Sequence, residues 1–198
     1  MKLVLATQNP KKLKEMNEIL SHLGVEVVSE AELGVRIEVE ETGETFTDNA
    51  RLKATAVMQA TGLPAVADDS GLCVDALNGG PGVYSARFGG EGLDDKGRYT
   101  LLLEMLRGQT DRAAHFHTSI VCAFPNGDEL VCEGECPGTI AFAPMGEGGF
   151  GYDPVFFVPE LRKTFGQLTA EEKASVSHRG KALRAFVAAL DDYLKGNE

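Results

Sequence analysis

Two adjacent carboxylates in the first half of the chain are the residues that most clearly suggest chemistry. The segment LPAVADDSGL (63–72) places Asp68, Asp69 and Ser70 directly after an apolar run, which we expect to be a buried strand that ends there. Moving an unpaired carboxylate out of water costs on the order of several kcal/mol, so a partner is expected. Carboxylate oxygens suit Mg²⁺, and one of them can orient or deprotonate an attacking water. The pair predicts a metal or catalytic site, with a turn or capping role as the alternative.

A second candidate is a polar segment between an apolar run and a helical pattern, TQNPKK, which contributes Thr7, Gln8, Asn9, Pro10, Lys11 and Lys12. Asn9 suits the N-cap of the helix and Pro10 its first position. A helix N-terminus carries roughly half a positive charge and unpaired N–H groups, so the segment suits phosphate. The alternative is a capped helix with solvated lysines. The sequence has no GxxxxGKS/T pattern, which disfavours a P-loop enzyme.

Two further segments combine polar residues with loop character. Glu40 and Glu41 lie in VEETGETF (39–46), which by itself indicates a solvated acidic loop. The segment GEGGFGYDPVF (146–156) matches GxGxxG literally, but we expect a strand after it, whereas a dinucleotide site needs a helix. Its flexible backbone better suits close approach to a flat base, with Phe150 or Tyr152 available for stacking and Asp153 for polar contacts.

Cations gather near the start of the last predicted helix. Ser177 suits its N-cap, so His178, Arg179 and Lys181 fall in the first turn, a short distance after Lys173. Positive charge at a helix N-terminus costs about a few tenths of a kcal/mol unless an anion offsets it. Because the whole chain has a formal net charge of −11, this local excess of cations indicates a small polyanionic ligand.

Strands and helices alternate in the first third of the chain, which indicates an α/β fold. We expect strands at 2–6, 25–29 and 63–67, and helices at 10–23 and 45–61 that end before Gly24 and Gly62. A helix at 94–107, a hairpin around Asn126-Gly127 and a final helix at 177–195 complete the prediction.

The totals exclude several classes of protein. A chain of 198 residues suits one large domain or two closely joined lobes. The net charge of −11 argues against a nucleic-acid binder, which needs a basic surface. No apolar run approaches the ~18 residues of a membrane helix, and the N-terminal apolar segment is too short for a signal peptide. We therefore predict a cytoplasmic protein with no membrane and no nucleic-acid partner.

Taken together, the motifs resemble the inosine triphosphate pyrophosphatases, also called non-standard purine nucleoside triphosphate (XTP/dITP) diphosphatases. The matching segments are LATQNPKKLKE, EETGETFTDNARLKA, ADDSGL with GGPGVYSARF, GGFGYDPVFF and EEKASVSHRGKAL, in the order of the family and over almost the whole chain. The resemblance implies hydrolysis of the α,β-phosphoanhydride of ITP, dITP and XTP to the monophosphate and pyrophosphate, with Mg²⁺ required. Two alternatives are a regulatory module that binds Mg²⁺-nucleotide without turnover and a pyrophosphatase for modified pyrimidine nucleotides.

The resemblance also implies roles for single residues. Asp69 is similar to the family's proton acceptor and metal ligand, and Glu40 to its second metal carboxylate, with Glu41 as a close alternative. Substrate contacts are implied at Thr7, Gln8, Asn9, Pro10, Lys11, Lys12, Ser70, Phe150, Gly151, Tyr152, Asp153, Lys173, His178 and Arg179. A site that donates hydrogen bonds to a 6-oxo group rejects ATP, and our hypothesis places His178 and Arg179 beside the base.

The fold implied by the resemblance is an elongated mixed β-sheet core flanked by helices. It forms a single domain of residues 1–198, with two lobes and a central active-site cleft, and the family is commonly homodimeric.

Overall fold

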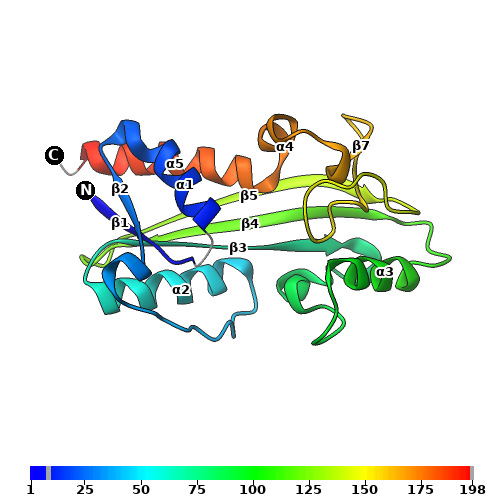
Figure 1. The fold of residues 1–198 in the computed structure, drawn as a ribbon, viewed down its shortest axis with the longest axis horizontal. Helices are drawn as coiled ribbons and strands as arrows, with labels where there is room; N and C mark the ends of the chain where they lie inside the picture. The colour runs from blue at the N-terminus through cyan, green and yellow to red at the C-terminus, as the bar shows by residue number, and fades with distance from the viewer. Residues whose placement is uncertain (8–9, 197–198) are drawn as a thin grey trace. The chain divides into compact units, whose positions relative to one another are not determined.

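The computed structural model describes residues 1–7 and 10–196 (Figure 1). Its strands are β1 (Lys2–Leu5), β2 (Glu26–Ser29), β3 (Ala65–Val74), β4 (Ala113–Ala123), β5 (Glu129–Ile140), β6 (Phe156–Val158) and β7 (Lys163–Thr164). Its α-helices are α1 (Pro10–Leu20), α2 (Phe46–Thr61), α3 (Asp95–Met105), α4 (Ala170–Val176) and α5 (His178–Gly196). Short 3₁₀ helices occupy Ser21–Leu23, Ala31–Leu33, Asp75–Leu77, Gly82–Arg87 and Phe165–Gln167.

The strands form one mixed sheet in the order β2-β1-β3-β4-β5-β6-β7. β1 runs parallel to β2, with Leu3 opposite Val27, and parallel to β3, with Val4 opposite Ala65. β6 is antiparallel to β5 and to β7. A mixed sheet with flanking helices confirms the predicted α/β class.

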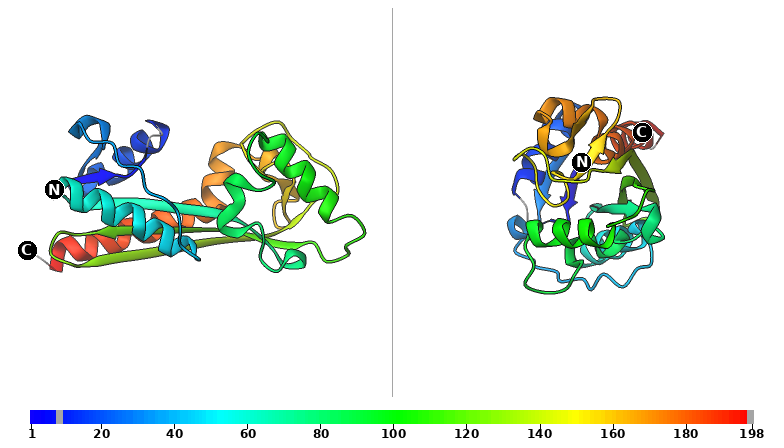
Figure 2. Two further views of the ribbon diagram at one scale, coloured as in Figure 1. Left: turned by 90° about the horizontal axis from the view of Figure 1, so that it is seen from below. Right: turned by 90° about the vertical axis from the view of Figure 1, so that its right-hand side faces the viewer.

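The chain divides into two compact units. Unit 1 comprises Met1–Asp69, Ser119–Glu133 and Ala182–Glu198, and unit 2 comprises Ser70–Thr118 and Gly134–Lys181. β3, β4, β5 and α5 each contribute residues to both units, and Met1 belongs to unit 1 together with the C-terminal part of α5. Figure 2 shows the chain from two further directions. The single domain, the elongated shape and the central cleft expected from the sequence stay predictions.

Helices cover both faces of the sheet in unit 1. Because side chains alternate along a strand, Leu3 and Leu5 of β1 point to one face and Val4 to the other. Leu3 and Leu5 belong to a buried cluster with residues of α1 and α5, whereas Val4 packs with Val57 of α2. Figure 1 shows the same arrangement, with α1 and α5 on one side of β1 and α2 on the other.

The helix ends agree with the sequence signals. Thr45 caps α2 by accepting a hydrogen bond from the Asp48 amide at 3.0 Å, and Gly62 follows the helix with φ of 67°. Ser177 Oγ accepts from the Gly180 amide at 3.1 Å, which confirms its predicted capping role before α5. Left-handed backbone favours glycine because a side chain is strained there.

The predicted end of the third strand is wrong. β3 does not stop at Asp68 but continues to Val74, so Asp68, Asp69 and Ser70 lie in its middle. The strand resumes an apolar pattern after them, and Leu72 and Val74 are fully buried in unit 2. The expected strand in YDPVFF is also shorter, since β6 starts only at Phe156.

Unit 2 has its own core. Leu102 of α3 and Leu106, which directly follows that helix, pack in one buried cluster with Phe116, Phe156 and Phe165.

Among residues 1–7 and 10–196, no helix combines the length and the apolar character needed to cross a membrane.

Candidate functional site

Lys53 of α2 lies among the carboxylates of unit 1. Its Nζ is 2.9 Å from Glu41 Oε1 and 3.8 Å from Asp69 Oδ1, and it donates to the carbonyl oxygen of Asp68 at 2.8 Å. The side chains of Lys53 and Asp69 are only 21% and 14% exposed. One ammonium group thus lies close to two carboxylates at the point where β3 carries its acidic pair. We call Glu41, Lys53 and Asp69 the carboxylate cluster.

Asn49 holds one carboxylate of this cluster. Its Nδ2 donates to Asp69 Oδ2 at 3.1 Å, while its Oδ1 accepts from the Gly43 amide at 2.8 Å. Asn49 is fully buried, so these two hydrogen bonds fix its amide group and, through it, the orientation of Asp69.

Sequence reasoning missed Asn49 and Lys53. The two residues are four positions apart on α2 and therefore share a face of the helix. Ala50 and Ala54, which are buried, lie next to them on the helix. Two polar residues beside small buried ones were therefore the sequence signal that could have identified Asn49 and Lys53 as site residues.

The two glutamates of the acidic segment differ in their surroundings. Glu40 is exposed, whereas Glu41 is 29% exposed and is ion-paired with Lys53. The sequence left the choice between them open, with Glu40 preferred by resemblance. In this structure it is Glu41 that lies beside the ammonium group shared with Asp69.

Part of the predicted phosphate segment also meets the acidic pair. Lys12 Nζ donates to both carboxylate oxygens of Asp68, at 2.9 and 2.8 Å. Thr7 and Lys53 line a pocket of about 290 Å³ in unit 1. Gln8 and Asn9 lie outside the described residues, and so do the side chains of Pro10 and Lys11.

In unit 2, the glycine-rich segment folds around a buried carboxylate. Asp153 Oδ2 accepts from the Phe150 amide at 2.9 Å and from Lys173 Nζ at 2.5 Å. Gly149 has φ of 78°, and a Cβ there would collide with the Asp153 carboxylate. Glycine is therefore required for the chain to turn around this acid.

Phe150 and Tyr152, which the sequence offered equally for stacking, have opposite environments. Phe150 is 74% exposed, whereas Tyr152 is 5% exposed and donates its hydroxyl to the Ser85 carbonyl at 2.8 Å. A ligand can reach the ring of Phe150, and Tyr152 is a packing residue of unit 2.

Lys173 lies beside both Phe150 and the buried acid. Its Nζ is 4.8 Å from the centre of the Phe150 ring and 5.2 Å from that of Phe165, distances suited to cation–π attraction. Burial raises the pKa of Asp153, and the charge and hydrogen bond of Lys173 oppose that rise. Lys173 thus forms an ion pair with the buried Asp153 carboxylate and also lies over two aromatic rings.

His178, the first residue of α5, belongs to an aromatic stack. Its ring lies 4.7 Å from Phe116 at an interplanar angle of 11°, and Phe116 stacks on Phe165 at 5.5 Å. Arg179 is half-buried beside His178 in the chain, and Ser70 is exposed. Sequence reasoning missed Phe116 and Phe165, because isolated apolar residues in strand-like segments indicate only a core.

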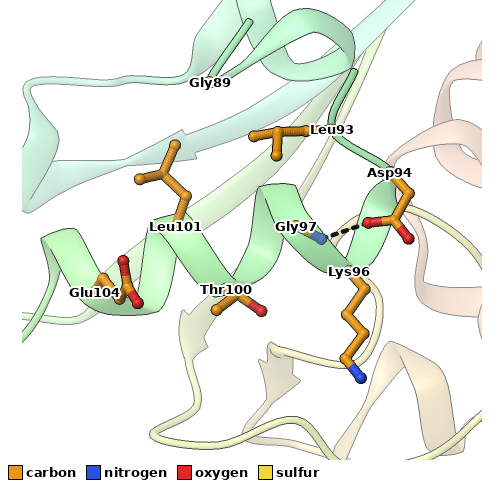
Figure 3. A pocket seen from close by; sticks show the side chains of 8 residues that line it. All are labelled: Gly89, Leu93, Asp94, Lys96, Gly97, Thr100, Leu101 and Glu104. Atoms are coloured by element: carbon orange, nitrogen blue, oxygen red, sulfur yellow. Dashed lines mark hydrogen bonds between the residues drawn. The ribbon is translucent and has the colours of Figure 1, made fainter. Parts of the chain in front are cut away.

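A different pocket, of about 570 Å³, runs along α3 in unit 2 (Figure 3). Its lining includes Leu93, Leu101 and Glu104, together with Asp94, which caps α3 by accepting from the Gly97 amide at 2.7 Å. None of the site residues predicted from the sequence lines this pocket.

Comparisons with known proteins place these residues in a family context. A curated relative from Exiguobacterium sp., called dITP/XTP pyrophosphatase, is 50% identical over 196 residues, covering 99% of this chain and 100% of the relative. A protein of the same name from Thermus thermophilus is 53% identical, covering 97% of this chain and 93% of its own.

Solved structures agree with this similarity over the whole length. The Ham1 protein of Staphylococcus aureus superposes with a TM-score of 0.92 at 41% identity and 100% coverage of both chains. A HAM1 protein from Coxiella burnetii gives 0.93 at 43% identity, covering 97% of this chain and 99% of that one. The sequence profile of the Ham1 family matches residues 3–189, and this chain therefore belongs to the Ham1 family.

Proposed function

We propose that this protein hydrolyses non-standard purine nucleoside triphosphates such as dITP, XTP and ITP to the nucleoside monophosphate and pyrophosphate. The observation that carries the proposal is the carboxylate cluster of unit 1, in which Asp69 is oriented by Asn49 and lies beside Lys53. The printed name of the relatives, dITP/XTP pyrophosphatase, supports the same reaction and substrate class.

Asp69 is the proton acceptor in this proposal. Its carboxylate takes a proton from the attacking water, and the water oxygen bonds to one of the two phosphorus atoms of the α,β-phosphoanhydride as that bridge breaks. The nucleoside monophosphate and pyrophosphate then leave. Asn49 holds Oδ2 of Asp69 through a hydrogen bond, and in this proposal Oδ1 takes the proton. Hydrolysis of this kind depends mainly on positioning and on charge neutralisation, and no covalent nucleophile is needed.

The same cluster suits a magnesium ion. In the described part of the chain, no three His, Cys, Asp or Glu side chains gather closely enough to hold a metal on their own. Mg²⁺ at nucleotide sites typically takes one or two carboxylates and fills its other positions with phosphate and water, and Asp69 with Glu41 provides that set. Glu40, which the resemblance favours, is the alternative second carboxylate. When bound, Mg²⁺ neutralises phosphate charge.

We propose different contacts for the different parts of the nucleotide. Lys12 and Lys53, with Thr7 and the rest of the segment up to Lys12, suit the triphosphate because they combine cations with a helix N-terminus. In unit 2, the exposed ring of Phe150 suits the base, and we keep Ser70, Gly151, Asp153, Lys173, His178 and Arg179 as further substrate contacts. Tyr152 contributes through packing. A homodimer stays our expectation from the family resemblance, and a cytoplasmic location stays our expectation from the sequence.

A nucleotide panel tests the proposal. The purified protein is incubated with dITP, XTP, ITP, ATP, GTP and a modified pyrimidine triphosphate, with Mg²⁺ or with EDTA, and the nucleotide product and pyrophosphate are both measured. We expect monophosphate and pyrophosphate from dITP, XTP and ITP, with kcat/KM on the order of 100-fold or more above ATP, and no turnover in EDTA. Binding without turnover would instead support a regulatory module, and turnover confined to pyrimidines would overturn the substrate class.

A further inference from the structure

The segment that presents Phe150 has few side chains to hold it in place. Four of the six residues from Gly146 to Gly151 are glycine. Gly146, Gly149 and Gly151 all have positive φ, between 59° and 85°. Glycine loses more conformational freedom on ordering than any other residue, so this loop needs hydrogen bonds from outside to keep one conformation.

Two carboxylates supply such bonds to consecutive amides. Asp153 accepts from the Phe150 amide at 2.9 Å, as described above, and Asp95 Oδ2 accepts from the Gly151 amide at 2.7 Å. The peptide groups on both sides of Phe150 are therefore held. The ring itself is 74% exposed, so packing contributes little to its position.

Asp95 reaches the loop from a well-anchored helix. It is the first residue of α3, and Leu102 of the same helix is fully buried. Its neighbour Asp94 has another task, because its carboxylate caps α3 through the Gly97 amide (Figure 3). Residues of α3 and of the glycine-rich loop, Phe150 among them, line a pocket of about 520 Å³ within unit 2.

We propose that Asp95 is a positioning residue that fixes the loop 146–151 so that the Phe150 ring is held ready for the nucleotide base. The proposal rests on the proposed function, in which Phe150 contacts the base. In this proposal Asp95 acts on the base only through its hydrogen bond with the Gly151 amide. Burial is the main cause of the raised pKa of Asp153, and the charge of Asp95 raises that pKa further. The effect of the Asp95 hydrogen bond and the effect of its charge therefore have to be separated by experiment.

Two substitutions at the same position make this separation. Asp95→Ala removes both the hydrogen bond and the charge, whereas Asp95→Asn removes the charge but keeps an oxygen that accepts from Gly151. Asp94→Asn is the matched control, because it removes a neighbouring charge while asparagine still caps the helix. Asp95 is exposed, so all three variants should fold, and circular dichroism checks that they do.

Two measurements follow on the wild type and the three variants: steady-state kinetics with dITP, and hydrogen exchange of the peptide that contains residues 146–153. For Asp95→Ala we expect KM to rise about fivefold, the effect of one lost hydrogen bond, with kcat within about twofold of the wild type. Exchange of the loop amides should accelerate by a similar factor. Asp95→Asn should restore both values, and Asp94→Asn should match the wild type.

Three results would overturn the proposal. Unchanged loop exchange in Asp95→Ala would show that the aspartate does not hold the loop. Equal KM values in Asp95→Asn and Asp95→Ala would assign the effect to charge, and a fall in kcat at constant KM would assign it to the chemical step. A wild type that does not hydrolyse dITP would sink the proposed function by itself, while the exchange measurement would still decide whether Asp95 anchors the loop.

Discussion

Removing the ammonium group of Lys53 gives a direct test of the carboxylate cluster. Lys53→Met keeps most of the side-chain length but deletes the charge that lies 2.9 Å from Glu41 and 3.8 Å from Asp69. Both carboxylates are largely shielded from water, at 29% and 14% exposure, so water replaces the lost partner poorly. We expect the variant to be less stable at neutral pH.

The size of this effect follows from the burial of the pair. An exposed ion pair contributes about 0–1 kcal/mol, and deleting one partner of a fully buried pair costs about 3–5 kcal/mol. Lys53 is 21% exposed and lies between these cases, so the free energy of unfolding should fall by about 2 kcal/mol. Because Lys53 is also the cation beside the two proposed metal ligands, its removal leaves their negative charge to a bound cation, and added Mg²⁺ should stabilise the variant more than the wild type.

The assay is urea unfolding at pH 7, with and without Mg²⁺. The matched control is Lys14→Met, because Lys14 pairs with Glu18 at 3.7 Å on the surface of α1, where the two side chains are 79% and 68% exposed. This control should lose less than about 0.5 kcal/mol. If Lys53→Met were as stable as the control, or if Mg²⁺ stabilised it no more than the wild type, the reasoning about the cluster would be refuted.

Three further predictions concern single side chains. Asp69→Asn should lower kcat by on the order of 1,000-fold or more, since it removes the proton acceptor but keeps the shape, with little change in melting temperature; a kcat near that of the wild type would reject the assigned role. Phe150→Ala should raise KM for dITP by about tenfold without loss of stability, because base–aromatic stacking is worth about 1–3 kcal/mol. Tyr152→Phe should instead lose about 1 kcal/mol of stability, the value of its hydrogen bond, and leave KM unchanged. The reverse pattern would contradict the assignment of Phe150 to the base and of Tyr152 to packing. Burial raises the pKa of Asp153 above 3.8, so the native protein keeps this proton at pH values where the unfolded chain has lost it. Stability should therefore fall as pH rises through that interval, and urea unfolding from pH 4 upward should show a smaller fall for Asp153→Asn; parallel pH profiles would argue against the raised pKa.

Local signals in the sequence were sufficient to predict most of the helices and strands. Gly62 after α2 and Ser177 before α5 mark helix ends through hydrogen bonds between near neighbours, so no distant contact was needed to find them. The family motifs likewise identify the candidate site, because they are short segments whose order along the chain is specific. The end of β3 could not be predicted from local signals. A strand continues wherever its neighbours in the sheet provide hydrogen bonds, and the polar triplet 68–70 does not interrupt those bonds.

What the sequence determined by itself is the fold class and the family, and it also gives a set of candidate site residues. Only the tertiary structure decided which of those residues meet: Glu41 rather than Glu40 beside Lys53, Phe150 rather than Tyr152 at the surface, and Asp95 next to Gly151 across 56 positions of the chain. The physical reason is that such contacts depend on how distant segments pack, and packing buries one of two similar neighbours while it exposes the other. Capping and periodicity, in contrast, act within a few residues and are therefore readable from the sequence alone.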